Sequence, residues 1–179
     1  MRVLAALGLT PTVLSFAGLA GNVIAASLVA HGELFTGGVV ALLSSSLDML
    51  DGALARATGK ASRSGAILDS VLDRISEAVV LGGVLWYALD TGNDDLVVLA
   101  FVAVVGSLLV SYVRARAEGL GITLTDGLFT RAERVVLTSL ALMLGWLRPA
   151  LWLLAVLTSL TAAQRLIIAM RKLREGPPA

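Results

Sequence analysis

The 179-residue chain is 57% hydrophobic, has a mean hydropathy of +0.88 and carries a formal net charge of +1. Soluble globular domains are usually about 45–50% apolar, so this composition excludes an ordinary soluble protein and predicts an integral membrane protein. Cysteine is absent, which excludes disulfide frameworks and thiolate metal sites. The lipid bilayer is therefore an expected partner, and nucleic acid is not.

Six apolar stretches follow one another, and most approach or exceed the roughly 20 residues that a helix needs to cross a bilayer. They cover residues 12–30, 37–57, 66–89, 95–117, 132–147 and 150–170. At the start of the first stretch, Pro11 suits the first position of a helix and Thr10 suits its N-cap. The pattern predicts an all-α bundle of six transmembrane helices in a single domain, residues 1–179.

Basic residues gather at alternate ends of these stretches, and the cytoplasmic side of membrane proteins accumulates Lys and Arg. If both termini are cytoplasmic, only Arg148 of the basic residues lies outside. Aromatic residues flank the outer turns, as an interfacial belt would. These residues are Trp86, Tyr87, Trp146 and Trp152. We therefore expect a multi-pass protein of the cell membrane with both termini inside.

The second and third stretches carry four aspartates at regular intervals in otherwise apolar surroundings. Asp48 and Asp51 are three residues apart, and Asp69 and Asp73 are four apart, so each pair shares one helix face. Counted along the helices at about 1.5 Å per residue, all four lie in the inner half of the bilayer. Carboxylates in membrane helices are costly and indicate a functional site.

If the two faces meet, four negative charges share a small volume, which requires cations. Carboxylate ligands without His or Cys favour Mg²⁺, Mn²⁺ or Ca²⁺ over zinc. Two such ions suit phosphoryl chemistry because they neutralise the attacking and departing oxygens. Gly52 and Gly65 leave room for a diphosphate, and Arg56 suits a phosphate or an aspartate. The alternative from another class is an ion-coupled transporter, or a membrane scaffold without catalytic activity.

The full spacing, D-x₂-D-G-x₂-A-R-x₈-G-x₃-D-x₃-D, resembles the signature of the CDP-alcohol phosphotransferase family at every fixed position. These positions are Asp48, Asp51, Gly52, Ala55, Arg56, Gly65, Asp69 and Asp73. The resemblance implies a membrane enzyme that transfers a phosphatidyl-type group from a CDP-linked lipid to an alcohol and releases CMP. It also implies that the four aspartates bind two Mg²⁺ or Mn²⁺ ions. Asp73 is then the general base, and the other seven positions line the CDP site.

Arginines near the inner ends of the fourth and fifth stretches point to the acceptor. Arg131 and Arg134 share a helix face, whereas Arg114 and Arg116 lie about 200° apart, so only one of the latter two faces inward. Guanidinium groups suit a phosphate monoester, although positive-inside topology or pairing of Arg114 with Glu118 would also explain them.

The segments Ser111–Glu118 and Arg131–Arg134 resemble the branch of the family that makes phosphatidylinositol phosphate or archaetidylinositol phosphate. This resemblance implies that Arg114, Arg116, Arg131 and Arg134, with Arg63, hold the phosphate of inositol 1-phosphate. The alternative acceptor is glycerol 3-phosphate, which would make the chain a phosphatidylglycerol phosphate synthase. The family and the small residues Ala78 and Gly82 together lead us to expect a homodimer.

Overall fold

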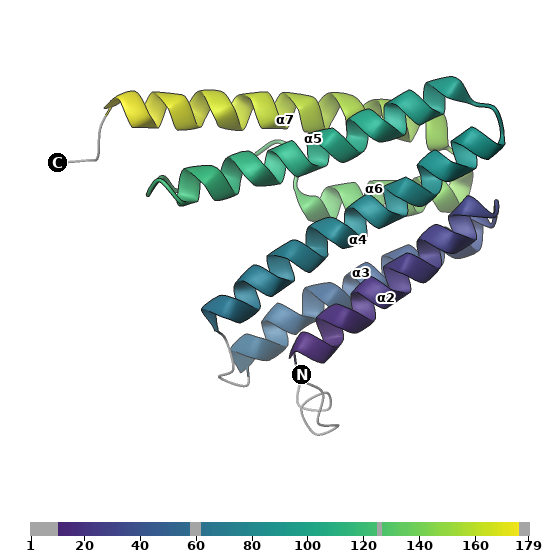
Figure 1. The fold of residues 1–179 in the computed structure, drawn as a ribbon, viewed down its shortest axis with the longest axis horizontal. Helices are drawn as coiled ribbons and strands as arrows, with labels where there is room; N and C mark the ends of the chain where they lie inside the picture. The colour runs from purple at the N-terminus through teal and green to yellow at the C-terminus, as the bar shows by residue number, and fades with distance from the viewer. Residues whose placement is uncertain (1–10, 58–61, 125–126, 176–179) are drawn as a thin grey trace.

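The computed structural model describes residues 11–57, 62–124 and 127–175, and it describes no side chain between residues 49 and 57. Six α-helices make up this part of the chain, and the structure has no strand there (Figure 1). They are α2 (Pro11–Ala30), α3 (Leu34–Ala57), α4 (Arg63–Asp90), α5 (Asp94–Glu118), α6 (Arg131–Leu144) and α7 (Leu147–Glu175). The predicted all-α class is confirmed, and each helix coincides within a few residues with one predicted stretch.

Local sequence explains where the helices begin and end. Pro11 opens α2, as predicted, whereas Thr10 lies outside the described residues. The side chain of Ser62 accepts a hydrogen bond from the Gly65 amide at 3.0 Å and so caps α4. Gly145 ends α6 with a φ of +68°, a left-handed conformation that glycine adopts without strain. Helix α6, the fifth predicted stretch, therefore stops at Leu144, three residues before its predicted end.

The helices form a bundle that is closed at one end and open at the other. The three short turns α2–α3, α4–α5 and α6–α7 lie together at one end, on the right in Figure 1. From that end α4 and α5 diverge, so that α2, α3 and α4 form one group and α5 and α7 another. The first residues of α2 and the last of α7 lie at the opposite end.

Small residues allow close helix packing near the closed end. A Cβ atom on Gly83 would lie 2.5 Å from the carbonyl oxygen of Ala26, so α4 and α2 are in backbone contact there. Ala25, Val84 and Ala100 are fully buried in the same core. In a bilayer, where lipid tails are as apolar as leucine, such close packing is a main source of helix association.

Large apolar side chains cover the outside of the bundle, as contact with lipid requires. Exposed examples are Phe16, Phe35, Phe101 and Leu153, together with the tryptophans Trp86, Trp146 and Trp152. Three described helices are long and apolar enough to cross a membrane, with spans Thr12–Ala30, Asp94–Glu118 and Leu147–Arg174. Of the other helices, α4 carries charged residues in its first half, and α6 has only 14 residues.

Candidate active site

Three of the predicted aspartates meet at the junction of α3 and α4. Asp48, Asp69 and Asp73 each offer a carboxylate oxygen, and these oxygens lie within 4.8 Å of one another. The condition that the two acidic faces meet therefore holds for these three residues. The side chain of Asp51 lies outside the described residues, as do those of Gly52, Ala55 and Arg56.

The environment of Asp48 fits a divalent cation. This residue is only 1% exposed, and its Oδ1 atom has no hydrogen-bond partner among the described residues. A buried carboxylate oxygen without a donor is costly unless a cation or water binds it. Gly18 of α2 packs so closely that an added Cβ would lie 3.0 Å from the Cβ of Asp48. Oxygen-only ligation of this kind suits Mg²⁺ or Mn²⁺.

Arg131 reaches this cluster from α6. Its Nη2 lies 2.7 Å from Oδ2 of Asp48, and its Nη1 lies 2.7 Å from Oδ1 of Asp73. The position of Arg131 follows from the start of α6, where the Glu133 carboxylate accepts a hydrogen bond from the Thr130 amide at 2.6 Å. This cap makes Arg131 the first residue of the helix.

Arg134, one turn further along α6, is held by a carboxylate that the sequence analysis did not identify. Its Nε and Nη2 donate to the two carboxylate oxygens of Glu77 at 2.6 and 2.8 Å, and its Nη1 donates to the Phe129 carbonyl at 3.3 Å. The side chains of Arg134 and Glu77 are 3% and 10% exposed. Glu77 follows Asp73 by four residues, and this continuation of the acidic face was a signal that could have revealed it.

A cavity of about 790 Å³ opens between α4, α5, α6 and α7 beside the cluster. Its volume is within the range usual for small-molecule sites. Five arginines and three carboxylates line it. They are Arg74, Arg114, Arg131, Arg134 and Arg165, with Asp73, Glu77 and Glu118. Counted as formal charges, this lining is cationic by two, which favours an anionic ligand.

The predicted acceptor residues divide into two groups. Arg114, Arg131 and Arg134 line the cavity, whereas Arg116 and Arg63 are exposed and are not among its lining residues. Only one of Arg114 and Arg116 thus faces inward, as the helical geometry predicted. The pairing of Arg114 with Glu118, which was the alternative explanation for this arginine, is present at 2.9 Å between half-exposed side chains.

Arg165 of α7 was missed as a site residue, because the sequence analysis treated it only as a positive charge at an inner helix end. The structure buries it to 6% exposure at the cavity wall, where its Nη1 donates to the Val110 carbonyl at 3.0 Å. A Cβ on Gly127 would lie 2.5 Å from its Nη2, so the loop before α6 packs against the guanidinium.

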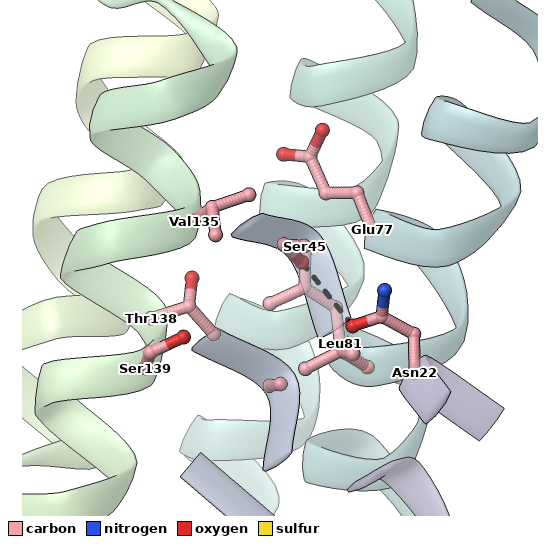
Figure 2. A pocket seen from close by; sticks show the side chains of 9 residues that line it. Asn22, Ser45, Glu77, Leu81, Val135, Thr138 and Ser139 are labelled. Atoms are coloured by element: carbon pink, nitrogen blue, oxygen red, sulfur yellow. Dashed lines mark hydrogen bonds between the residues drawn. The ribbon is translucent and has the colours of Figure 1, made fainter. Parts of the chain in front are cut away.

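A small chamber with polar and apolar lining residues lies on the other side of Glu77 (Figure 2). Asn22 and Ser45 face Glu77, Thr138 and Ser139 across about 20 Å³ of space. The hydroxyl of Ser45 donates to Asn22 Oδ1 at 3.3 Å, and Asn22 Nδ2 donates to the Gly18 carbonyl at 3.0 Å. This volume is enough for one water molecule. The rest of the lining is apolar, from Ala41, Val80, Leu81 and Val135.

Gly65, expected near the CDP site, lies in the exposed first turn of α4. Its amide binds the Ser62 hydroxyl, and an added Cβ would lie 3.0 Å from that hydroxyl oxygen. A residue without a side chain at position 65 therefore also leaves room for the Ser62 hydroxyl that caps α4.

Known proteins with this arrangement identify the family. A family model for CDP-alcohol phosphatidyltransferases matches residues 8–169. A phosphatidylinositol phosphate synthase from Mycobacteroides abscessus is 38% identical over 96% of this chain and 80% of its own length. An archaetidylinositol phosphate synthase from Pyrococcus horikoshii is 35% identical over 98% of this chain and 91% of its own length.

Solved structures agree with the sequence comparisons. The phosphatidylinositol phosphate synthase of Mycobacterium tuberculosis with bound CDP-DAG has a TM-score of 0.87 and 36% identity, covering 94% of this chain and 90% of that one. The same enzyme in complex with manganese and citrate has a TM-score of 0.84 and 35% identity, with 94% and 86% coverage. The chain described here belongs to the CDP-alcohol phosphatidyltransferase family.

Proposed function

We propose that this protein transfers a phosphatidyl-type group from a CDP-linked lipid to inositol 1-phosphate and releases CMP, as a step of phospholipid biosynthesis. The observation that carries this proposal is the position of Asp73. Among the three described carboxylates of the cluster, Asp73 is the one that also lines the arginine-rich cavity. A single side chain thus joins a candidate metal site to a candidate binding site for an anionic acceptor.

The donor side of the proposal rests on the acidic cluster. Asp48, Asp51, Asp69 and Asp73 would hold two Mg²⁺ or Mn²⁺ ions. When bound, the ions neutralise charge on the diphosphate of the donor and so favour departure of CMP. Gly52, Ala55, Arg56 and Gly65 would line the CDP site with these aspartates. The buried Oδ1 of Asp48 supports this assignment, because an acceptor without a donor is costly there unless a cation or water binds it.

The reaction on the acceptor side needs a base and no covalent intermediate. Asp73 takes the proton of the acceptor hydroxyl as that oxygen attacks the lipid-linked phosphorus. The bond between this phosphorus and the oxygen of CMP breaks, and CMP departs with the electron pair. The side chain of Asp73 is 22% exposed and lies on the cavity wall, so an acceptor in the cavity can reach it.

Arginines would hold the phosphate of inositol 1-phosphate and thereby orient the hydroxyl that reacts. Arg114, Arg131 and Arg134 are the first candidates because they line the cavity. Arg116 and Arg63 would contribute only at its entrance, since both are exposed. Guanidinium groups bind phosphate with paired, charge-assisted hydrogen bonds.

We further infer a single domain, residues 1–179, that spans the cell membrane six times with both termini and the active site on the cytoplasmic side. The charges support this topology, since Arg148 lies beside the closed end and the arginines of the cavity toward the open end. The absence of cysteine allows a direct test with single-cysteine variants. In intact cells, a membrane-impermeant thiol reagent should label His31→Cys and not Ser64→Cys; the reverse pattern would contradict this orientation.

We also propose that the protein forms a homodimer. Gly82 is exposed, and an added Cβ there would meet no atom within 4 Å, so this face of α4 is open to a second copy. Gly83, in contrast, is already in contact with α2. Mild oxidation should crosslink Gly82→Cys into dimers in the membrane and leave Val98→Cys monomeric. Equal crosslinking of both variants would contradict a specific interface at Gly82.

The test of the function is CMP release from CDP-diacylglycerol by the purified protein. Parallel reactions contain inositol 1-phosphate, glycerol 3-phosphate, serine or free inositol. We expect inositol 1-phosphate to give the fastest release. Turnover with glycerol 3-phosphate alone would make the chain a phosphatidylglycerol phosphate synthase. An absence of CMP with every acceptor would favour the transporter or scaffold alternative.

A further inference from the structure

Arg131 lies in the position that a cation would take among the aspartates. Its two terminal nitrogens each lie 2.7 Å from a different carboxylate, one on α3 and one on α4. The Asp48 side chain has no exposed surface and the Asp73 side chain is 22% exposed, so water screens their mutual repulsion poorly. The guanidinium supplies the opposite charge that keeps these carboxylates together.

The guanidinium is nevertheless incompletely bound. Its Nε is buried and has no hydrogen-bond partner among the described residues, and its side chain is 23% exposed on the wall of the large cavity. Arg134 is a useful contrast, since all three of its nitrogens donate to Glu77 or Phe129 and its side chain is 3% exposed. Arg134 is therefore a fixed part of the wall, whereas Arg131 is partly exposed at the cavity and keeps one buried donor, Nε, unused.

We propose that Arg131 is an exchangeable counter-ion that competes with the divalent cations for Asp48 and Asp73. Without metal, the Arg131 guanidinium is ion-paired with Asp48 and Asp73. When these carboxylates bind metal, the guanidinium is released toward the cavity and becomes a ligand for the acceptor phosphate. The inference rests on the proposed function only in taking the cavity as a phosphate site. It makes one residue the link between the loading of the metal site and the binding of the acceptor.

Thermodynamic linkage predicts the direction in which metal and anion change each other's affinity. If metal binding frees Arg131 for an anion, metal must tighten anion binding, and the anion must tighten metal binding by the same factor. Typical couplings of this kind lie at roughly 5- to 150-fold. Loss of the guanidinium removes a competitor, so Arg131→Gln should bind metal more tightly. The same variant should bind the anion less tightly and should lose most of the coupling.

The experiment measures binding in purified protein without CDP-lipid or inositol phosphate. Mn²⁺ affinity is read by electron paramagnetic resonance of the free ion, and sulfate, a divalent anion that stays soluble with Mn²⁺, serves as the probe of the cavity. In the wild type we expect Mn²⁺ and sulfate to strengthen each other's binding. Because no substrate is present, a chain without transferase activity would still give this result, so the two proposals fail separately.

Three variants separate competition from other effects. Arg131→Gln should lower the Mn²⁺ dissociation constant by about tenfold, within the usual range of coupling. Arg114→Gln lines the same cavity and should weaken sulfate while leaving Mn²⁺ affinity unchanged. Arg148→Gln, which loses an exposed pair with Asp95, is the control for the loss of an ion-paired arginine.

Any of three results would overturn the proposal. The first is an unchanged Mn²⁺ affinity in Arg131→Gln. The second is independent binding of Mn²⁺ and sulfate in the wild type, and the third is a coupling in Arg131→Gln as strong as in the wild type. The wild-type measurement needs no variant, so the proposal stays testable if Arg131→Gln does not fold.

Discussion

The two ends of the bundle use the same helices for different purposes. At the closed end, three short turns join the helices, and alanine, glycine and valine pack them into contact. At the open end, α4 and α5 diverge (Figure 1), and the buried residues there include the charged Asp48, Arg134 and Arg165. Close packing at the closed end holds the bundle together while the helices diverge at the open end, where charged side chains line a cavity.

The comparison shows where polar groups can be placed in a membrane bundle. Buried charges of the open end are paired with opposite charges from other helices, as Arg134 of α6 is with Glu77 of α4 and Asp48 of α3 is with Arg131 of α6. The stability of that end therefore depends on paired charges, and its chemistry depends on the few atoms that remain unpaired, such as Oδ1 of Asp48. Substitutions at the two ends should have different consequences.

The largest effect is expected at the base. Asp73→Asn removes the proton acceptor and should lower the rate of CMP release by about 10²–10⁴-fold, the usual contribution of general base catalysis. The thermal unfolding midpoint in detergent should remain close to that of the wild type. Asp90→Asn, at the exposed closed end, is the matched control and should keep its activity. An active Asp73→Asn would exclude Asp73 as the base.

Breaking the buried pair of the open end should mainly cost stability. Glu77→Gln leaves Arg134 with an uncompensated charge at 3% exposure, which should lower the free energy of unfolding by about 3–5 kcal/mol. Glu118→Gln removes the partner of Arg114 in an exposed pair of the same type and should cost only about 0.3–0.5 kcal/mol. Chemical denaturation of both variants checks the difference; equal losses would show that burial of the pair does not matter.

Packing at the closed end can be tested with neighbouring glycines. Gly83→Ala places a Cβ 2.5 Å from the Ala26 carbonyl oxygen, so α2 and α4 must separate, at a cost of about 1–3 kcal/mol. Within one protomer, Gly82→Ala meets no atom within 4 Å, so in monomeric protein it should be neutral or stabilising by up to about 1 kcal/mol. Activity per folded molecule should be retained in both. A Gly83→Ala protein as stable as Gly82→Ala would contradict the backbone contact.

The smallest effect is expected for the charge pair at the closed end. Arg148 and Asp95 lie 3.1 Å apart with side chains that are 59% and 48% exposed. Arg148→Gln should change stability by less than about 1 kcal/mol and should not change CMP release. A loss of several kcal/mol would mean that charges at this end support the fold as strongly as those at the open end.

Much of the fold followed from local sequence signals. Runs of apolar residues located all six helices, and the regular spacing of Asp69 and Asp73 indicated the shared acidic face that the structure confirms. Such signals act within one helix. The left-handed Gly145, which ends α6 early, depends on a single glycine within an apolar stretch, and the broad hydropathy pattern does not register it.

The contacts between helices were harder to predict from the sequence. Spacing placed Arg131 and Arg134 on one face of α6, but it did not show that one reaches Asp48 and Asp73 while the other pairs with Glu77. These pairs join residues that are 57 to 83 positions apart in the chain. They depend on how α6 packs against α3 and α4, which no periodicity within a helix encodes.

The most direct test of the account is the identity of the lipid that the protein makes. Purified protein is incubated with CDP-diacylglycerol and inositol 1-phosphate, with Mg²⁺ or Mn²⁺ or with a chelator, and the lipids are analysed by mass spectrometry. The account predicts phosphatidylinositol phosphate and CMP in equal amounts, and neither product in the presence of the chelator. CMP formed with phosphatidic acid instead, or product formed equally well with the chelator, would contradict it.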